Sequence, residues 1–274
     1  MAQQNKGCGC GTLFLGLILV GLVFDWDLDL PPEIEVETYE GRSPRRPMPG
    51  GQRDEYIIKD PGKPQDSQGT AFVVDRDGVW LTAEHVTHGC DYLGVDTGDD
   101  VRWSNRVLES RESDAAVIRD GPPSNLALPI STRLPRQGEQ GYHMGFPASR
   151  PAVVISRFIG SADARRGGIS NREPIYVWAE QSRLPASNGS LGGISGGPTM
   201  SERGNVIGIN SASTERRGRV LTTDPHAVRR LVRASGDVDE RPTPQPIRNA
   251  REAERRFQQY LQGGQIRQVY CDVR

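Results

Sequence analysis

The sequence contains few lysines and few aromatic residues, and each shortage excludes a class of protein. Its only lysines are Lys6, Lys59 and Lys63. A nucleotide-binding P-loop needs a lysine beside its glycine-rich turn, so no such site can follow Lys63. Aromatic residues make up 6% of the chain, against 32 glycines and 20 prolines. This composition is typical of short strands joined by turns and argues against a helical bundle.

An excess of charge is lacking as well. The formal net charge is −1 at pH 7, so the overall balance indicates no nucleic-acid partner. Arginine supplies most of the positive charge, and residues 223–274 are rich in it. We expect those arginines to cover solvent-exposed helix faces.

Cysteine is scarce, with only Cys8, Cys10, Cys90 and Cys271. If the body of the protein is exported, an oxidising compartment allows Cys90 and Cys271 to form a disulfide. Two separate thiols are the equal alternative, because the sequence does not show that the two residues meet.

Long hydrophobic runs are lacking apart from residues 7–24 (GCGCGTLFLGLILVGLVF), which carry no charge. As a helix it spans roughly 27 Å, close to the hydrocarbon thickness of a bilayer. Lys6 precedes it and three aspartates follow within five residues, which places the N-terminus in the cytoplasm. We predict that residues 1–30 are an uncleaved signal-anchor with one transmembrane helix. The body would then lie in the periplasm or outside the cell. A cleaved signal peptide is the alternative, but no small-x-small site ends the run.

The remaining chain divides by composition. Residues 31–64 are rich in proline and predict an extended linker. From residue 67 the sequence pattern predicts short strands. The first two, GTAFVV and GVWLTA, flank residues 75–78 and predict a hairpin. Further strand candidates are DYLGVD, VRWSNRVL, DAAVIR, NLALPI, GYHMGF, AVVISRFIG, PIYVWAE and VIGINSAS. This pattern predicts an all-β sandwich or barrel pair. Residues 224–235 and 249–262 predict two helices near the C-terminus.

The stretch SLGGISGGPTM places one serine, Ser195, between two pairs of glycines. It fits the G-x-S-x-G elbow of the α/β-hydrolases, but that fold needs a helix directly after the serine. It also needs an acid and a histidine later in the chain, and His226 is the only later histidine. A proline and a β-hairpin pattern follow instead, so this interpretation is weak.

An upstream histidine and acid suit Ser195 better. His85 follows a strand that ends LTA, and Asp114 begins the apolar strand SDAAVI. In this order, with GTAFVV, GYHMGFP, GISGGPTM and GNVIGINSAS around them, the chain resembles the trypsin-like serine peptidases. Within these it is similar to the bacterial HtrA-type branch. The resemblance covers residues 67–213.

The resemblance implies an all-β double antiparallel β-barrel, with residues 65–132 as the first barrel and residues 133–222 as the second. It implies a serine endopeptidase for protein or peptide substrates, without metal or organic cofactor. With the predicted membrane anchor, we expect a role in envelope protein processing or quality control. A serine hydroxyl needs a base to take its proton, a role for His85, while Asp114 orients the imidazole. Gly193 and Ser195 would supply the N–H groups of the oxyanion hole. Residues 223–274 remain as a short helical tail.

The chain departs from the family at several positions. No PDZ-like strand series follows the second barrel, and Ile194 stands where the family has Asp or Asn. Gly189 occupies the position of the pocket aspartate of trypsins, which argues against basic P1 residues. With Ser211, Ala212 and Ser213 as further substrate-binding residues, it predicts a small or medium uncharged P1 side chain.

Other readings stay open. A catalytically silent relative could bind peptides or a partner in the same cleft, and Ile194 is the one feature that favours it. The run EHVTHGC, residues 84–90, offers potential metal ligands, but no second cluster in the sequence completes a site. His88 is assigned to a loop beside the cleft. His143 lies in a predicted strand and is assigned a structural role. The oligomeric state is not predicted.

Overall fold

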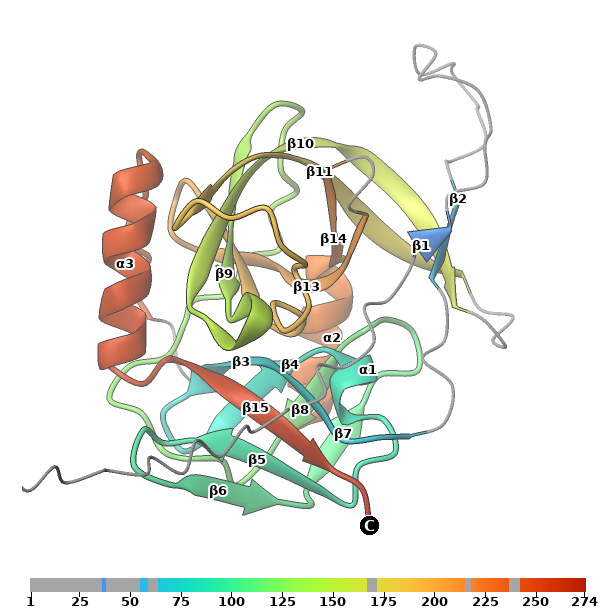
Figure 1. Ribbon diagram of the computed structural model, residues 1–274, viewed down its shortest axis with the longest axis vertical. Coiled ribbons are helices and arrows are strands. Elements are labelled where there is room, and N and C mark those ends of the chain that lie inside the picture. Colours follow the sequence, from blue (N-terminus) through green and yellow to red (C-terminus); the bar gives the residue numbers. More distant parts are fainter. Residues whose placement is uncertain (1–35, 38–54, 59–63, 167–171, 215–217, 237–241) are drawn as a thin grey trace, which may run out of the picture.

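The computed structural model describes residues 36–37, 55–58, 64–166, 172–214, 218–236 and 242–274 (Figure 1). These residues form two curled, mainly antiparallel sheets, drawn one above the other in Figure 1, with helices at their sides. The predicted all-β double barrel is therefore confirmed.

The first barrel, at the bottom of Figure 1, is a seven-stranded sheet in the order β6-β5-β15-β3-β4-β8-β7. Its strands are β3 (Ser67–Asp75), β4 (Val79–Thr82), β5 (Tyr92–Asp96), β6 (Val101–Ser104), β7 (Val107–Glu109), β8 (Ala116–Ile118) and β15 (Ile266–Asp272). Because residues 105 and 106 alone join the two edge strands, the sheet has to curl round on itself.

The second barrel closes through hydrogen bonds. Its strands are β9 (Gln140–Gly145), β10 (Ala152–Arg166), β11 (Arg172–Leu184), β12 (Pro198–Ser201), β13 (Val206–Thr214) and β14 (Arg219–Thr223). They follow the order β10-β11-β14-β13-β12-β9, and β9 pairs with β10 again to complete the ring. Trp178, Tyr142 and Met144 are fully buried in its walls. Trp178 belongs to an apolar cluster of the second barrel, whereas Tyr142 and Met144 belong to a larger cluster that includes residues of the first. Strands β9 and β12 are therefore buried on both faces.

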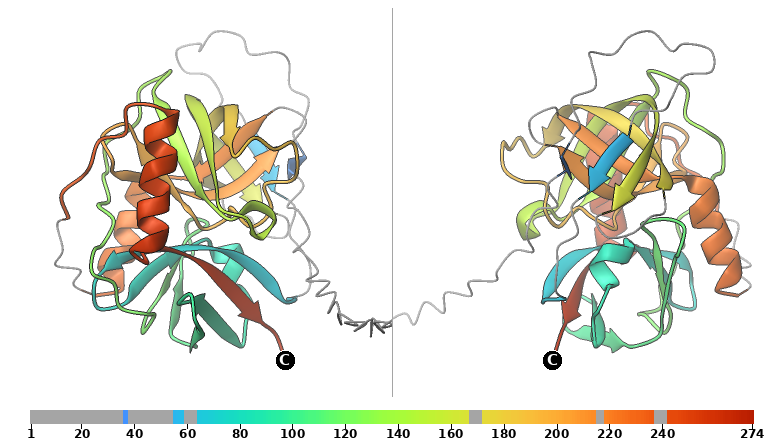
Figure 2. Two further views of the ribbon diagram at one scale, coloured as in Figure 1. Left: turned by 60° about the vertical axis from the view of Figure 1, so that its left-hand side comes forward. Right: turned by 90° about the vertical axis from the view of Figure 1, so that its right-hand side faces the viewer.

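Three helices accompany the barrels. The short α1 (Glu84–Thr87) follows β4, and the two predicted C-terminal helices appear as α2 (Pro225–Ala234) and α3 (Ala250–Gln262). Side-chain oxygens of Asp224 and Asn249 accept hydrogen bonds from backbone N–H groups in the first turns of α2 and α3, as N-caps do. Helix α2 contacts both barrels, through β8 and β13. Helix α3 stands beside the second barrel (Figure 2) and buries Phe257.

The structure corrects the prediction that the C-terminus is a helical tail. After α3 the chain forms β15, which lies between β3 and β5 and pairs with both. Val269 and Ile266 on this strand are fully buried. The strand was missed because its residues, IRQVYCD, mix polar and apolar types, and only the two neighbouring strands give it a buried face.

The predicted linker also contributes to the fold. Residues 36–37 and 55–58 form β1 (Val36–Glu37) and β2 (Glu55–Ile58) at the edge of the second sheet, where β2 runs parallel to β10. Ile58 is 2% exposed and packs against Ala164 and Ile175. The long strands β10 and β11 extend past the barrel and leave an edge that β2 covers.

Two of the strand predictions are wrong. VRWSNRVL, residues 101–108, is predicted as one strand but contributes to two, β6 and β7, at opposite edges of the first sheet. NLALPI, residues 125–130, forms only an isolated bridge between Ile130 and Val206. Pro129 has no N–H to give to a ladder, and its carbonyl accepts a hydrogen bond from Val206 instead. The segment is a connection between the barrels.

No helix in the described ranges combines the length and hydrophobicity needed to cross a bilayer. The predicted membrane segment, residues 7–24, lies outside the residues that the structure describes.

Candidate active site

His85 and Asp114 come together because two strands pair. Thr82 at the end of β4 lies opposite Ala116 at the start of β8. His85 follows β4 by three residues and Asp114 precedes β8 by two, so both lie at the same end of this strand pair. His85 Nδ1 lies 2.8 Å from Asp114 Oδ2. The backbone N–H of His85 donates to Oδ1 of the same carboxylate at 3.0 Å. These two contacts orient the imidazole of His85 relative to the carboxylate of Asp114.

The second barrel supports the carboxylate from the other side. Asp114 is 1% exposed, and the hydroxyl of Ser211, on β13, donates to its Oδ2. The backbone N–H of Asp114 donates to Glu173 Oε2, on β11, at 2.7 Å. Asp114 therefore has hydrogen-bond partners in both barrels. Its carboxylate oxygens accept hydrogen bonds, as an ionised carboxylate requires.

Ser195 lies on a turn that presses against the first barrel. Its carbonyl accepts a hydrogen bond from the N–H of Thr70, on β3, at 2.8 Å. Gly196 has φ +86°, and a Cβ there would come within 2.1 Å of the Thr70 carbonyl and 2.2 Å of Thr82 Oγ1. The half-buried Ser195 hydroxyl lies 3.5 Å from the Ser211 carbonyl. Ser211 thus contacts both the serine and the acid.

The peptide before the serine is held in one orientation. Gly193 has φ +93°, and a Cβ there would meet the Phe146 carbonyl at 2.5 Å. The carbonyl of Gly192 accepts a hydrogen bond from the N–H of Ala148 at 2.8 Å. A trans peptide points its N–H away from its C=O, so this contact turns the Gly193 N–H to the opposite side. Within the described part of the chain, the N–H groups of Gly193 and Ser195 have no acceptor.

A buried hydroxyl holds the next carbonyl. Thr70 Oγ1 donates to the Gly193 carbonyl at 2.7 Å and accepts from the N–H of Phe146 at 3.2 Å. Thr70 is fully buried. The two carbonyls that flank the Gly193 N–H are therefore both held by hydrogen bonds, one from a backbone N–H and one from the Thr70 hydroxyl.

Ile194 is anchored by burial. It is 4% exposed and packs with Leu191, Trp178 and Val154 in the apolar cluster of the second barrel. Its N–H donates to the Leu191 carbonyl at 3.0 Å, and its own carbonyl accepts from the N–H of Gly197 at 3.0 Å. Hydrophobic contact therefore orders the turn at a position where the family uses a polar residue.

The residues predicted to bind substrate differ in their surroundings. Gly189 is exposed, with open space at its Cβ position, and its carbonyl accepts a hydrogen bond from Arg183. The hydroxyl of Ser211 donates a hydrogen bond to Asp114, so only the backbone of Ser211 is left to bind a substrate. Ala212 is 9% exposed and joins an apolar cluster. Ser213 lies on β13, and its side chain is outside the described part.

His143 belongs to the core of the second barrel. It is fully buried on β9, where Nδ1 donates to Asn210 Oδ1 at 2.8 Å and Nε2 accepts from the Ser156 hydroxyl at 2.6 Å. Burial lowers its pKa to about 4, against the smaller opposite effect of the Asn210 hydrogen bond. A neutral, doubly hydrogen-bonded ring suits the predicted structural role.

The structure adds three residues that the sequence did not reveal: Thr70, Glu173 and Glu109. Thr70 lies inside the strand GTAFVV, and Glu173 follows an arginine in a stretch without a motif. Glu109, on β7, lies beside Glu84 and His88. No local pattern marks any of them, because each is defined by a partner distant in the chain.

Residues 69–209 match the family described as trypsin-like peptidase domain. The chain is 29% identical over 153 residues to a putative serine protease HhoA of Synechocystis, covering 53% of this chain and 36% of that protein. It is 31% identical over 170 residues to a probable periplasmic serine endoprotease DegP-like of Hahella chejuensis, covering 60% and 34%. The chain thus spans about a third of the length of these relatives.

Among solved structures, the active form of the Rv3671c protease from M. tuberculosis is similar, with a TM-score of 0.51 at 19% identity. The match covers 66% of this chain and 76% of that one. At this identity it supports the fold alone.

Proposed function

Since the chain belongs to the trypsin-like peptidase domain family, we propose that it is a serine endopeptidase with Ser195 as nucleophile, His85 as base and Asp114 as orienting acid. The observation that carries this proposal is the His85–Asp114 pair at 2.8 Å, next to a serine turn whose two N–H groups have no acceptor in the described residues.

In the proposed reaction, the Asp114 carboxylate accepts a hydrogen bond from the Nδ1–H of His85, which leaves Nε2 unprotonated as the basic nitrogen. His85 Nε2 takes the proton of the Ser195 hydroxyl as Oγ forms a bond to the substrate carbonyl carbon. The carbonyl oxygen gains the negative charge, and the N–H groups of Gly193 and Ser195 stabilise it. His85 then gives its proton to the leaving amine, and the C–N bond breaks. Water repeats the sequence on the acyl-enzyme and regenerates Ser195.

Substrates in this proposal are proteins or peptides in an extended conformation. The backbone of residues 211–213, on β13, is the element offered for pairing with them. The open position at Gly189 carries no acidic side chain, which supports cleavage after uncharged residues.

The proposed setting is the outer side of a membrane, with residues 1–30 as the anchor. The uncharged run at residues 7–24 supports the anchor. A disulfide between Cys90 and Cys271 supports an oxidising compartment, since such bonds persist mainly in exported proteins.

A fluorophosphonate probe, which reacts with activated serines, tests the mechanism. The full chain in detergent is compared with Ser195→Ala, His85→Ala and, as a matched control, Ser161→Ala at an exposed serine on β10. We expect labelling of the wild type and the control, none of Ser195→Ala, and a loss of peptide hydrolysis of roughly 10⁴-fold or more in His85→Ala.

Equal labelling of Ser195→Ala would sink the assignment of the nucleophile. A folded wild type that neither labels nor cleaves peptides would instead favour a silent peptide-binding relative, the competing hypothesis.

A further inference from the structure

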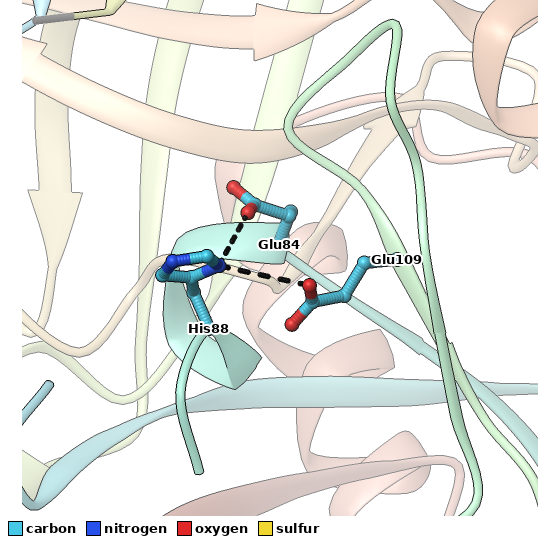
Figure 3. A group of neighbouring side chains, drawn as sticks. All are labelled: Glu84, His88 and Glu109. Atoms are coloured by element: carbon cyan, nitrogen blue, oxygen red, sulfur yellow. Dashed lines mark ion pairs between the residues drawn. The ribbon is translucent and has the colours of Figure 1, made fainter. Parts of the chain in front are cut away.

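Three potential metal ligands converge outside the His85–Asp114 pair. Glu84 and His88 lie at the two ends of α1, one helical turn apart, and Glu109 lies on β7 (Figure 3). Figure 3 shows the imidazole of His88 directed at both carboxylates. The distances are 3.2 Å from His88 Nδ1 to Glu84 Oε1 and 3.6 Å to Glu109 Oε2. One ligand atom from each residue lies within 4.8 Å of the others.

The two separations from His88 Nδ1 fit a tetrahedral ion. Zinc binds imidazole nitrogen and carboxylate oxygen at about 2.0–2.2 Å, so two ligands of a tetrahedral zinc lie about 3.3–3.6 Å apart. The two measured distances, 3.2 and 3.6 Å, are close to that range. Zinc could therefore enter with small side-chain adjustments.

The glutamate on β7 is oriented by a buried residue. The hydroxyl of Thr87 lies 2.8 Å from Glu109 Oε1 and 2.9 Å from the carbonyl of Glu84. Thr87 is 3% exposed. The contact with Oε1 leaves Oε2 on the side of His88, as hydrogen bonds commonly orient ligating carboxylates. The imidazole of His88 is 65% exposed, so an ion can reach the site from solvent.

We propose that Glu84, His88 and Glu109 bind a divalent ion of the zinc type, with solvent at the fourth position. The nitrogen ligand favours zinc over calcium or magnesium, which take oxygen ligands. The ion would join β7 to α1, the element that carries His85.

Direct zinc binding tests the site. The full chain in detergent is stripped with a chelator, and zinc is titrated against a competing chromophoric chelator. We expect one zinc per chain, and an affinity reduced roughly tenfold or more in both His88→Ala and Glu109→Gln, each of which loses one of the three ligands. The matched controls are His226→Ala and Glu112→Gln, at an exposed histidine and an exposed glutamate that are not part of the cluster. These should bind zinc as the wild type does.

His85→Ala locates the ion, because zinc could also bind at the His85–Asp114 pair. Retained affinity in His85→Ala supports the proposal, whereas lost affinity overturns it. Wild-type affinity in both His88→Ala and Glu109→Gln would also overturn it, as would a wild-type chain that binds no zinc. Circular dichroism verifies that each variant is folded. Fluorophosphonate labelling of Ser195 is scored separately, so failure of the metal site leaves the proposed function standing.

Discussion

At the scale of single residues, two histidines show how surroundings decide a role. A buried carboxylate faces Nδ1 of His85, whereas an amide oxygen and a hydroxyl face the two nitrogens of His143. The carboxylate can stabilise an imidazolium, and the neutral partners of His143 cannot. The first histidine can therefore carry a proton during a reaction, while the second serves only to satisfy polar groups in the core.

The buried His143 predicts acid sensitivity of the fold. Its pKa is about 4 in the folded state and about 6.5 when unfolded. Between these values the unfolded state binds more protons, so the free energy of unfolding falls as the pH drops from 6.5 to 4. The loss is at most about 3 kcal/mol.

Urea denaturation at pH 7 and pH 4.5 measures this loss. His143→Gln should be less stable than the wild type at pH 7 but lose less stability on acidification. His226→Gln, at an exposed histidine, is the control. If His143→Gln loses as much stability as the wild type, the assignment of the acid sensitivity to His143 is wrong.

At the scale of elements, strand β3 of the first barrel holds the serine turn of the second. The backbone N–H of Thr70 binds the Ser195 carbonyl, and its hydroxyl binds the Gly193 carbonyl. Because an oxyanion hole works only if its N–H groups are fixed before the charge develops, Thr70 acts as a positioning residue for the proposed reaction. It does not contact the substrate in this mechanism.

Removing the Thr70 hydroxyl should lower kcat more than it changes KM. Thr70→Val keeps the shape but leaves the buried carbonyl of Gly193 and the N–H of Phe146 unpaired, at a cost of about 1–3 kcal/mol in stability. We expect kcat to fall roughly ten- to a hundred-fold, less than the 10²–10³ that follows loss of an oxyanion donor itself. Thr70→Ser restores the hydroxyl and should recover most of the rate. A folded Thr70→Val with wild-type kcat would contradict the role.

At the scale of the whole molecule, the C-terminal strand completes the first barrel. A disulfide joins Cys271 on β15 to Cys90, a residue soon after α1, across 181 residues of sequence. A crosslink that closes so long a loop stabilises a fold by roughly 5 kcal/mol in the chain-entropy model. The disulfide therefore links the segment just after α1, the helix that contains His85, to strand β15.

The redox state of this pair reports the proposed location. In cells that express the full chain with Cys8→Ser and Cys10→Ser, a maleimide should react with Cys90 and Cys271 only after reduction. A chain that lacks residues 1–30 should stay in the cytoplasm, and both thiols should react without reduction. The full chain should also resist carbonate extraction from membranes. Immediate reaction of both thiols in the full chain would contradict export.

Much of this organisation followed from local sequence. Alternating apolar residues and turn residues predicted most strands, the β3–β4 hairpin and the ends of α2 and α3, since these depend on neighbours within a few positions. The order of His85, Asp114 and Ser195 within their motifs was enough to propose a reaction. An extended segment without such a pattern, residues 125–130, was assigned wrongly.

Only the tertiary structure decided which distant residues meet. Thr70 and Gly193 are 123 residues apart, and Ser211 and Asp114 are 97 apart, so their hydrogen bonds depend on strand register and on the packing of one barrel against the other. The strand β15 and the third candidate metal ligand, Glu109, became visible for the same reason. Local sequence determines which structure a segment favours, whereas its partners are determined by the whole fold, because a contact between remote residues forms only when all the intervening elements are in place.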